Sequence, residues 1–156
     1  MNDAPLFPTR EYHTDGTVPG LDRVLVFGSN TGGRHGNGAA LLAAKFFGAT
    51  EGIGRGRTGN AYAIATRQQK SESNNWIVTR TLEEIAVEIA DFCAYTLRHT
   101  YLEYFVTAVA CGNAGFEPIQ IAPLFRDAVN CSFPKGWKLY LDEADHRVFE
   151  NYKKSM

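Results

Sequence analysis

Residue types suited to holding a phosphate gather in one glycine-rich stretch. Gly28 to Gly38 reads Gly-Ser-Asn-Thr-Gly-Gly-Arg-His-Gly-Asn-Gly and leads directly into an alanine-rich segment. Glycines let backbone N–H groups approach a ligand closely, and the start of a helix adds unpaired N–H groups and a partial positive charge. Arg34 is suited to pairing with a phosphate through two hydrogen bonds. His35 is either a general base near neutral pH or a solvated loop residue.

A second stretch of this kind, Cys111-Gly112-Asn113-Ala114-Gly115-Phe116, follows an apolar segment. Backbone donors from two such loops can clamp a diphosphate, and Phe116 offers a ring for stacking. Cys111 has no base or cation beside it in the sequence, so we expect a packing residue rather than a nucleophile. The GK[ST] ending of a P-loop is absent, and the glycine spacing fits the dinucleotide fingerprint poorly. The glycines of either loop alone can also simply make turns.

Apolar segments place both loops after strands. We expect strands at 24–27, 61–66 and 104–110, helices at 39–47, 81–98 and 118–129, and a closing strand at 138–141. Thr81 and Glu84 match a capping box at the start of the second helix, whose inward positions are Ile85, Ile89, Phe92 and Leu97. The stretch 67–75 is polar and is expected to be exposed. Strands that alternate with helices indicate an α/β fold with a mostly parallel sheet, in which ligands bind beyond the carboxyl ends of the strands.

Length and composition favour a single domain. We predict an arm or lead-in at 1–23 and the folded domain at 24–156. The net charge of -1 gives no strong attraction to nucleic acid or anionic lipid. Three cysteines without a CxxC spacing, and histidines without ligand spacing, indicate neither a disulfide framework nor a metal site. With no signal peptide and no apolar membrane span, we expect a cytoplasmic protein.

Taken in order, these features resemble the macro domains, and most closely the subgroup of terminal ADP-ribose glycohydrolases and antitoxins that reverse ADP-ribosylation of DNA. The resemblance spans 24–127 and includes Thr66-Arg67, Trp76, the helix from Leu82 and the loop Ala110 to Gly115. It implies a three-layer α/β/α sandwich that binds ADP-ribose. Asn30 would approach the distal ribose, Gly33 to Gly38 would face the proximal portion, and Gly112 to Gly115 would hold the diphosphate. The subgroup's catalytic lysine falls on Arg67, which cannot readily lose a proton and attack.

We therefore expect a bacterial or phage protein that reads or sequesters ADP-ribose or a related NAD-derived nucleotide, with no cofactor. Its partner would be an ADP-ribose-like small molecule or an ADP-ribosylated macromolecule, with no membrane, and nucleic acid only as a modified substrate. Two alternatives stay open: an ADP-ribosyl or phosphoester hydrolase that uses His35, and an α/β interaction domain that binds no nucleotide. The expected ligand contacts are Gly28, Ser29, Asn30, Gly32, Gly33, Arg34, Gly36, Asn37, Gly38, Thr66, Arg67, Cys111, Gly112, Asn113, Ala114, Gly115 and Phe116.

Overall fold

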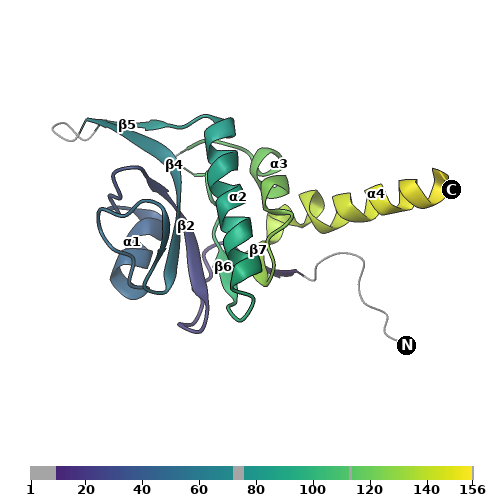
Figure 1. Cartoon of the computed structure of the whole chain (residues 1–156), viewed down its shortest axis with the longest axis horizontal. Helices are drawn as coiled ribbons and strands as arrows, with labels where there is room; N and C mark the ends of the chain where they lie inside the picture. The colour runs from purple at the N-terminus through teal and green to yellow at the C-terminus, as the bar shows by residue number, and fades with distance from the viewer. Residues whose placement is uncertain (1–9, 72–75, 113, 156) are drawn as a thin grey trace.

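A computed structural model of the chain describes residues 10–71, 76–112 and 114–155 (Figure 1). Its strands are β1 (Glu11–His13), β2 (Val24–Asn30), β3 (Gly56–Thr58), β4 (Ala61–Ser71), β5 (Trp76–Thr79), β6 (Tyr104–Val106) and β7 (Cys131–Pro134). Its α-helices are α1 (Gly38–Phe46), α2 (Leu82–Arg98), α3 (Pro118–Ile121) and α4 (Asp142–Ser155), with 3-10 helices η1 (Ala122–Phe125) and η2 (Lys135–Tyr140). Within the described residues, none of the helices is long and apolar enough to cross a membrane.

The strands form one mixed sheet in the order β1-β7-β6-β2-β4-β3, and β5 pairs with β4. From β1 to β4 every neighbouring pair is parallel, whereas β3 and β5 run antiparallel to β4. The structure therefore confirms the expected α/β class with a mostly parallel sheet. Because β2 and β6 run in the same direction side by side, the loops that follow these two strands lie at the same edge of the sheet.

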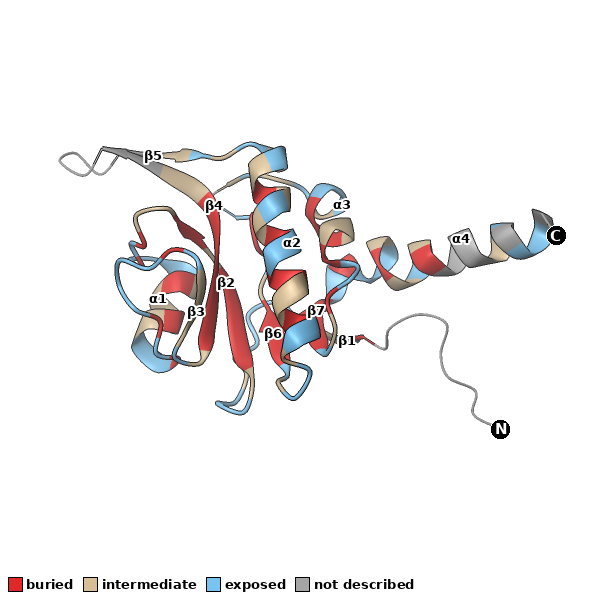
Figure 2. Cartoon of the chain, in the orientation of Figure 1, coloured by how far each residue is buried: buried red, intermediate tan, exposed pale blue. Residues whose placement is uncertain are grey.

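Helices cover both faces of this sheet (Figure 1). Successive side chains of a strand point to opposite faces. In β2, Phe27 packs with Ala43 of α1 in one buried cluster, and Val26 packs with Ile89 and Phe92 of α2 in the other. Figure 2 shows the resulting buried band along β2 and the first part of β4. The alanines of α1 let that helix lie close to the strands that carry the first glycine loop.

The capping box at the start of α2 is confirmed. The Thr81 hydroxyl accepts from the Glu84 N–H at 3.2 Å, and the Thr81 N–H donates to the Glu84 carboxylate at 3.0 Å. Ile85 is fully buried as expected, but Leu97 is 56% exposed. The inward prediction for Leu97 was wrong because the helix turns that position toward solvent in its last turn, where only Thr96 is buried.

The closing strand expected at 138–141 is wrong. Residues 135–140 form η2, and Trp137 and Leu141 are nevertheless buried to 1% and 0% exposure. The strand is instead β7, which lies between β1 and β6. Apolar residues of a 3-10 helix that packs on the core produce the same sequence pattern as a short strand.

Three further boundaries differ from the expected ones. The expected polar segment begins with residues 67–71, which continue β4 and pair with β5; residues 72–75 lie outside the described part. The helix expected at 118–129 is only α3 followed by η1, which contains Pro123. Part of the segment expected to lead into the domain, β1, pairs with β7, so the sheet begins before residue 24.

Candidate functional site

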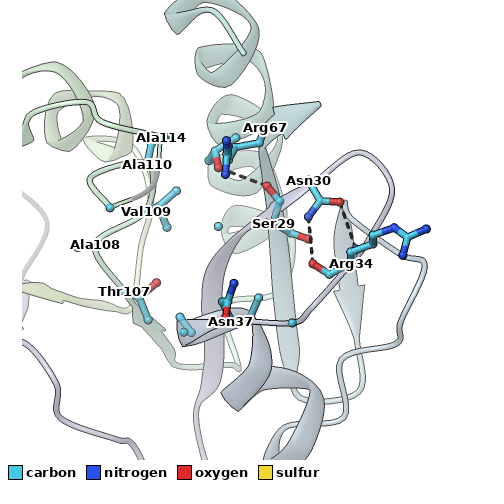
Figure 3. A pocket seen from close by; sticks show the side chains of 17 residues that line it. Ser29, Asn30, Arg34, Asn37, Arg67, Thr107, Ala108, Val109, Ala110 and Ala114 are labelled. Atoms are coloured by element: carbon cyan, nitrogen blue, oxygen red, sulfur yellow. Dashed lines mark hydrogen bonds between the residues drawn. The ribbon is translucent and has the colours of Figure 1, made fainter. Parts of the chain in front are cut away.

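A cavity of about 690 Å³ lies at the carboxyl end of β2 and beside the middle of β4, against the start of α1 and the loop after β6. Its wall includes many of the residues singled out from sequence: Gly28, Ser29, Asn30, Arg34, Gly36, Asn37, Gly38, Thr66, Arg67, Gly112 and Ala114. Figure 3 shows residues 107–110 and Ala114 on one side and Ser29, Asn30 and Arg34 across from them. The structure thus brings the two glycine loops together on one cavity.

Other predicted contacts lie elsewhere. The expected residues Gly32, Gly33, His35, Cys111, Gly115 and Phe116 are not among those that line the cavity, and Asn113 lies outside the described residues. Phe116 is partly buried and packs at the border of the larger buried cluster. The side chain of Trp76 also lies outside the described part.

Sequence reasoning missed six wall residues: Ala39, Ala40, Thr107, Ala108, Val109 and Ala110. The first two sit at the start of α1, where helix geometry alone could have indicated them. The other four were expected to continue the third strand. The chain instead leaves the sheet after Val106, with a tight turn in which the Val109 N–H donates to the Thr107 carbonyl at 2.7 Å. Ala110 there has φ +63°, a left-handed conformation that alanine rarely adopts.

The first loop is closed by its own asparagine. The Asn30 Nδ2 donates to the Arg34 carbonyl at 3.0 Å, and the Asn30 Oδ1 accepts from the Arg34 N–H at 3.1 Å (Figure 3). Asn30 is 8% exposed and reaches the cavity wall as well. Its amide therefore fixes the loop first, and can contact a ligand only through its remaining hydrogen and lone pair.

Backbone packing against the segment 51–54 also holds this loop in place. Gly33 has φ +67°, and a Cβ there would overlap the backbone of Gly52. A Cβ on Gly54 would overlap the carbonyl oxygen of Asn30. The Gly52 N–H donates to the Gly33 carbonyl at 2.8 Å. These glycines are needed for close approach of two backbones, whereas the cavity is lined by Gly36 and Gly38 of the same loop.

The imidazole of His35 lies behind the loop rather than on the cavity wall. His35 is 3% exposed, and its ring meets that of Phe27 edge to face, with centroids 5.2 Å apart. Its Nε2 lies 3.1 Å from the Ser29 hydroxyl, and its Nδ1 lies 3.7 Å from a carboxylate oxygen of Glu51. His35 is therefore not a solvated loop residue. It is not among the residues that line the cavity, and it meets the wall at the Ser29 hydroxyl.

The charge on the wall favours an anion. Among the described residues that line the cavity, two are arginines and none is an aspartate or glutamate. In Figure 3 the guanidinium of Arg34 points away from the second loop, and Arg67 lies between that loop and Ser29. The Asn37 side chain makes no capping hydrogen bond to α1, which leaves the first N–H groups of this nine-residue helix for a ligand.

Neither thiol chemistry nor a metal centre is indicated by the described residues. Burial, followed by the charge of Asp15, raises the pKa of Cys111 to about 11, which keeps the thiol protonated at neutral pH. All three cysteines are free. Within residues 10–71, 76–112 and 114–155, no three His, Cys, Asp or Glu side chains converge as a metal site would require. The chemistry of the site rests on backbone N–H groups, hydroxyls and arginines.

Comparison with known proteins does not assign the chain to a family. No model of a known protein family matches the sequence. A search of curated proteins found no match either. The function must therefore be argued from the cavity and from the residues that form it.

Proposed function

We propose that the chain is a macro-domain-like protein that binds ADP-ribose or a related NAD-derived nucleotide, as a reader or sequestering module. The observation that carries this proposal is that both glycine loops, which lie about 80 positions apart in the sequence, face one cavity. The cavity volume of about 690 Å³ falls within the range of small-molecule sites. The three-layer arrangement of helices on a mostly parallel sheet is compatible with the macro-domain resemblance.

The wall supports a ligand that carries phosphate. The start of α1 and the loop at Gly112 offer backbone N–H groups, and Arg67 supplies a positive charge. Because the whole chain has a net charge of -1, this attraction is local and is set by the site rather than by the protein's overall field. Small residues such as Gly28 and Ala110 leave room for a ligand to lie against the backbone.

Binding is favoured over lysine-based glycosyl cleavage by the residue at position 67. Among the described residues that line the cavity none is a lysine, and Arg67 lies at the place where the resemblance puts the catalytic lysine. An arginine stays protonated at all working pH values, so it can hold a phosphate or ribose but cannot act as the nucleophile.

Calorimetric titration with ADP-ribose tests the proposal, and chromatography of the recovered ligand detects any turnover. We expect micromolar binding and intact ligand. Arg67→Ala should weaken binding about 10-fold or more, since a charge-assisted hydrogen bond contributes about 1.5–3 kcal/mol. Arg98→Ala, which removes an exposed cation from the far end of α2, should leave the affinity unchanged. Absence of both heat and a thermal shift at millimolar ADP-ribose would refute the proposal.

A further inference from the structure

Ser29, His35 and Glu51 form a chain of side chains that ends on the cavity wall. Ser29 is 5% exposed and lines the cavity, and its hydroxyl lies 3.1 Å from the His35 Nε2. On the other side of the ring, the Nδ1 lies 3.7 Å from the Glu51 Oε2. A hydroxyl, an imidazole and a carboxylate in this order are the components of a nucleophile, its base and the group that orients the base.

The carboxylate of Glu51 lies on the Nδ1 side of the His35 ring. The Glu51 oxygens accept from the backbone N–H of His35 at 3.1 and 3.2 Å, which holds the negative charge beside the ring. Among the described residues the Nδ1 has no hydrogen-bond partner, and the Glu51 Oε2 lies 3.7 Å from it. A negative charge there favours the tautomer with the proton on Nδ1. The Nε2 is then an acceptor, and the Ser29 hydroxyl donates to it.

The surrounding backbone holds this arrangement rigidly. The register between β2 and β4 shifts at Ser29 and Asn30, and such a bulge re-aims side chains at the end of a strand. The loop with His35 and the segment with Glu51 are locked together by the contact between Gly33 and Gly52. The buried ring packs on Phe27. Reacting groups held by rigid elements need little reorganisation during a reaction.

We infer that Ser29 is a nucleophile that cleaves small carboxylic esters bearing an anionic group. The Ser29 Oγ bonds to the carbonyl carbon while its proton passes to the His35 Nε2. The ester C–O bond then breaks, and the leaving alcohol takes the proton from Nε2. Water is the second reactant: its oxygen bonds to the acyl carbon, its proton passes through Nε2 to the Ser29 Oγ, and the bond to Oγ breaks to release the acid.

The start of α1 supplies the other requirement of such a reaction. Gly38 and Ala39 line the same cavity as Ser29, and no side chain caps the helix there. Backbone N–H groups at a helix start stabilise the negative oxygen that forms when an ester is attacked. Arg67 on the same wall explains why an anionic group on the substrate is favoured. This activity goes beyond nucleotide binding and does not depend on it.

The chain contains its own comparison for this site. The Ser132 hydroxyl lies 2.8 Å from the His13 Nδ1, which is closer than the 3.1 Å between Ser29 and His35. The His13 ring stacks on Phe105, with ring centroids 3.7 Å apart. Ser132 does not line the cavity of about 690 Å³. Because Ser132 lies outside this cavity, we expect its contact with a histidine to be insufficient for reaction. The reactivity of the two serines toward the same probe can therefore be compared.

Labelling with an alkyl fluorophosphonate, located by peptide mass mapping, tests the inference. We expect one phosphonyl group on Ser29, no label in Ser29→Ala, and unchanged labelling of Ser29 in Ser132→Ala. A missing Ser29 adduct in the unmodified protein would overturn the inference. Because the probe contains no nucleotide, this result is independent of whether ADP-ribose binds, and calorimetry on Ser29→Ala measures that separately.

The positioning residues are tested by the rate rather than by the presence of the label. Glu51→Gln keeps an acceptor for the His35 N–H but loses the charge, and the exposed side chain at this position makes misfolding a minor concern. With mono-p-nitrophenyl succinate, whose free carboxylate supplies the anionic group, kcat should fall about 10-fold or more in Glu51→Gln while KM changes little, and Glu51→Asp should restore part of it. His35→Gln should lower kcat about 100-fold or more. Equal kcat in Glu51→Gln and the unmodified protein would contradict the relay, even where His35→Gln fails to fold.

Discussion

The amide of Asn30 joins both backbone groups of Arg34, with its Nδ2 on the carbonyl oxygen at 3.0 Å and its Oδ1 on the N–H at 3.1 Å. One side chain at the end of β2 thereby closes the first glycine loop over four residues. This contact holds in place the part of the cavity wall that Ser29, Asn30 and Arg34 form. The loop is therefore held in shape before any ligand arrives.

Replacing Asn30 with aspartate should open this loop. A carboxylate only accepts, so one of its oxygens would face the Arg34 carbonyl oxygen without a hydrogen. Burial at 8% exposure makes the lost bond costly, and we expect Asn30→Asp to destabilise the protein by about 1–3 kcal/mol. Urea unfolding measures the loss, and amide hydrogen exchange at Arg34 should become faster.

The control for this change is Asn37→Asp. Asn37 is an exposed N-cap residue whose side chain makes no capping hydrogen bond, and aspartate is an equally good N-cap. Its unfolding free energy should stay within about 0.5 kcal/mol of the original value. Equal losses of unfolding free energy in the two variants would mean that the hydrogen bonds between Asn30 and Arg34 do not stabilise the protein.

A methyl group at Gly54 should separate the first loop from the segment beneath it. The Cβ of Gly54→Ala would overlap the Asn30 carbonyl oxygen, so one of the two backbones must move. We expect a loss of about 1–3 kcal/mol in unfolding free energy, as for other overpacked positions, together with weaker ligand binding. Thermal unfolding and calorimetry measure the two effects.

Gly136→Ala is the matched change for that experiment. A Cβ at Gly136 would meet nothing within 4 Å, and its backbone is not in the left-handed region. Both its stability and its ligand affinity should remain near the original values. Equal stability and equal ligand affinity in Gly54→Ala and Gly136→Ala would contradict the close contact between Gly54 and the Asn30 carbonyl oxygen.

The positions of the two glycine loops could be predicted from the sequence because apolar runs mark the strands before them. The separate roles of the glycines could not. Gly33 and Gly54 serve close backbone contacts, while Gly36 and Gly38 line the cavity, and both roles select the same residue for the same lack of a Cβ. Only the fold shows that residues 28–38 pack on residues 51–54.

Local pattern was also insufficient where tertiary pairing decides the structure. The four residues of β7 become a strand because β1 and β6 lie on either side of them. The turn at residues 107–110 contains no glycine or proline, so its apolar sequence reads as a continued strand. A solvated His35 was one of two predictions because the sequence does not show whether neighbouring segments cover a loop residue. By contrast, Thr81 and Glu84 were predictable because a capping box is local.

The charge of Glu84 should make this cap depend on pH. The hydrogen bonds from the backbone and then the side chain of Thr81 lower the pKa of Glu84 below its ordinary value of 4.5. A lowered pKa means that the stabilisation is complete above about pH 4.5 and is lost as the pH falls through the folded-state value. The unmodified protein should therefore have a higher melting temperature than Glu84→Gln at pH 7. The difference should disappear as the pH falls below the lowered folded-state pKa of Glu84. A difference that grows toward acid pH would contradict this assignment, because glutamine retains the acceptor at all pH values.

Arg10 should contribute more to stability than its place near the N-terminal end suggests. Its side chain is 1% exposed, and it donates to Asp142 at 2.6 Å, to Asp145 at 3.1 Å and to the Arg126 carbonyl at 2.9 Å. Among the described residues, Arg10→Met would leave the buried Asp145 with Arg126 as its remaining ion-pair partner. Removing one partner of a buried pair costs about 3–5 kcal/mol, and urea unfolding should show a loss of this order. Arg23→Met removes a partly buried arginine that pairs with the exposed carboxylates of Glu11 and Glu103, and it should cost less than about 1 kcal/mol. Similar small losses in both variants would mean that β1 and α4 are not held together by this network.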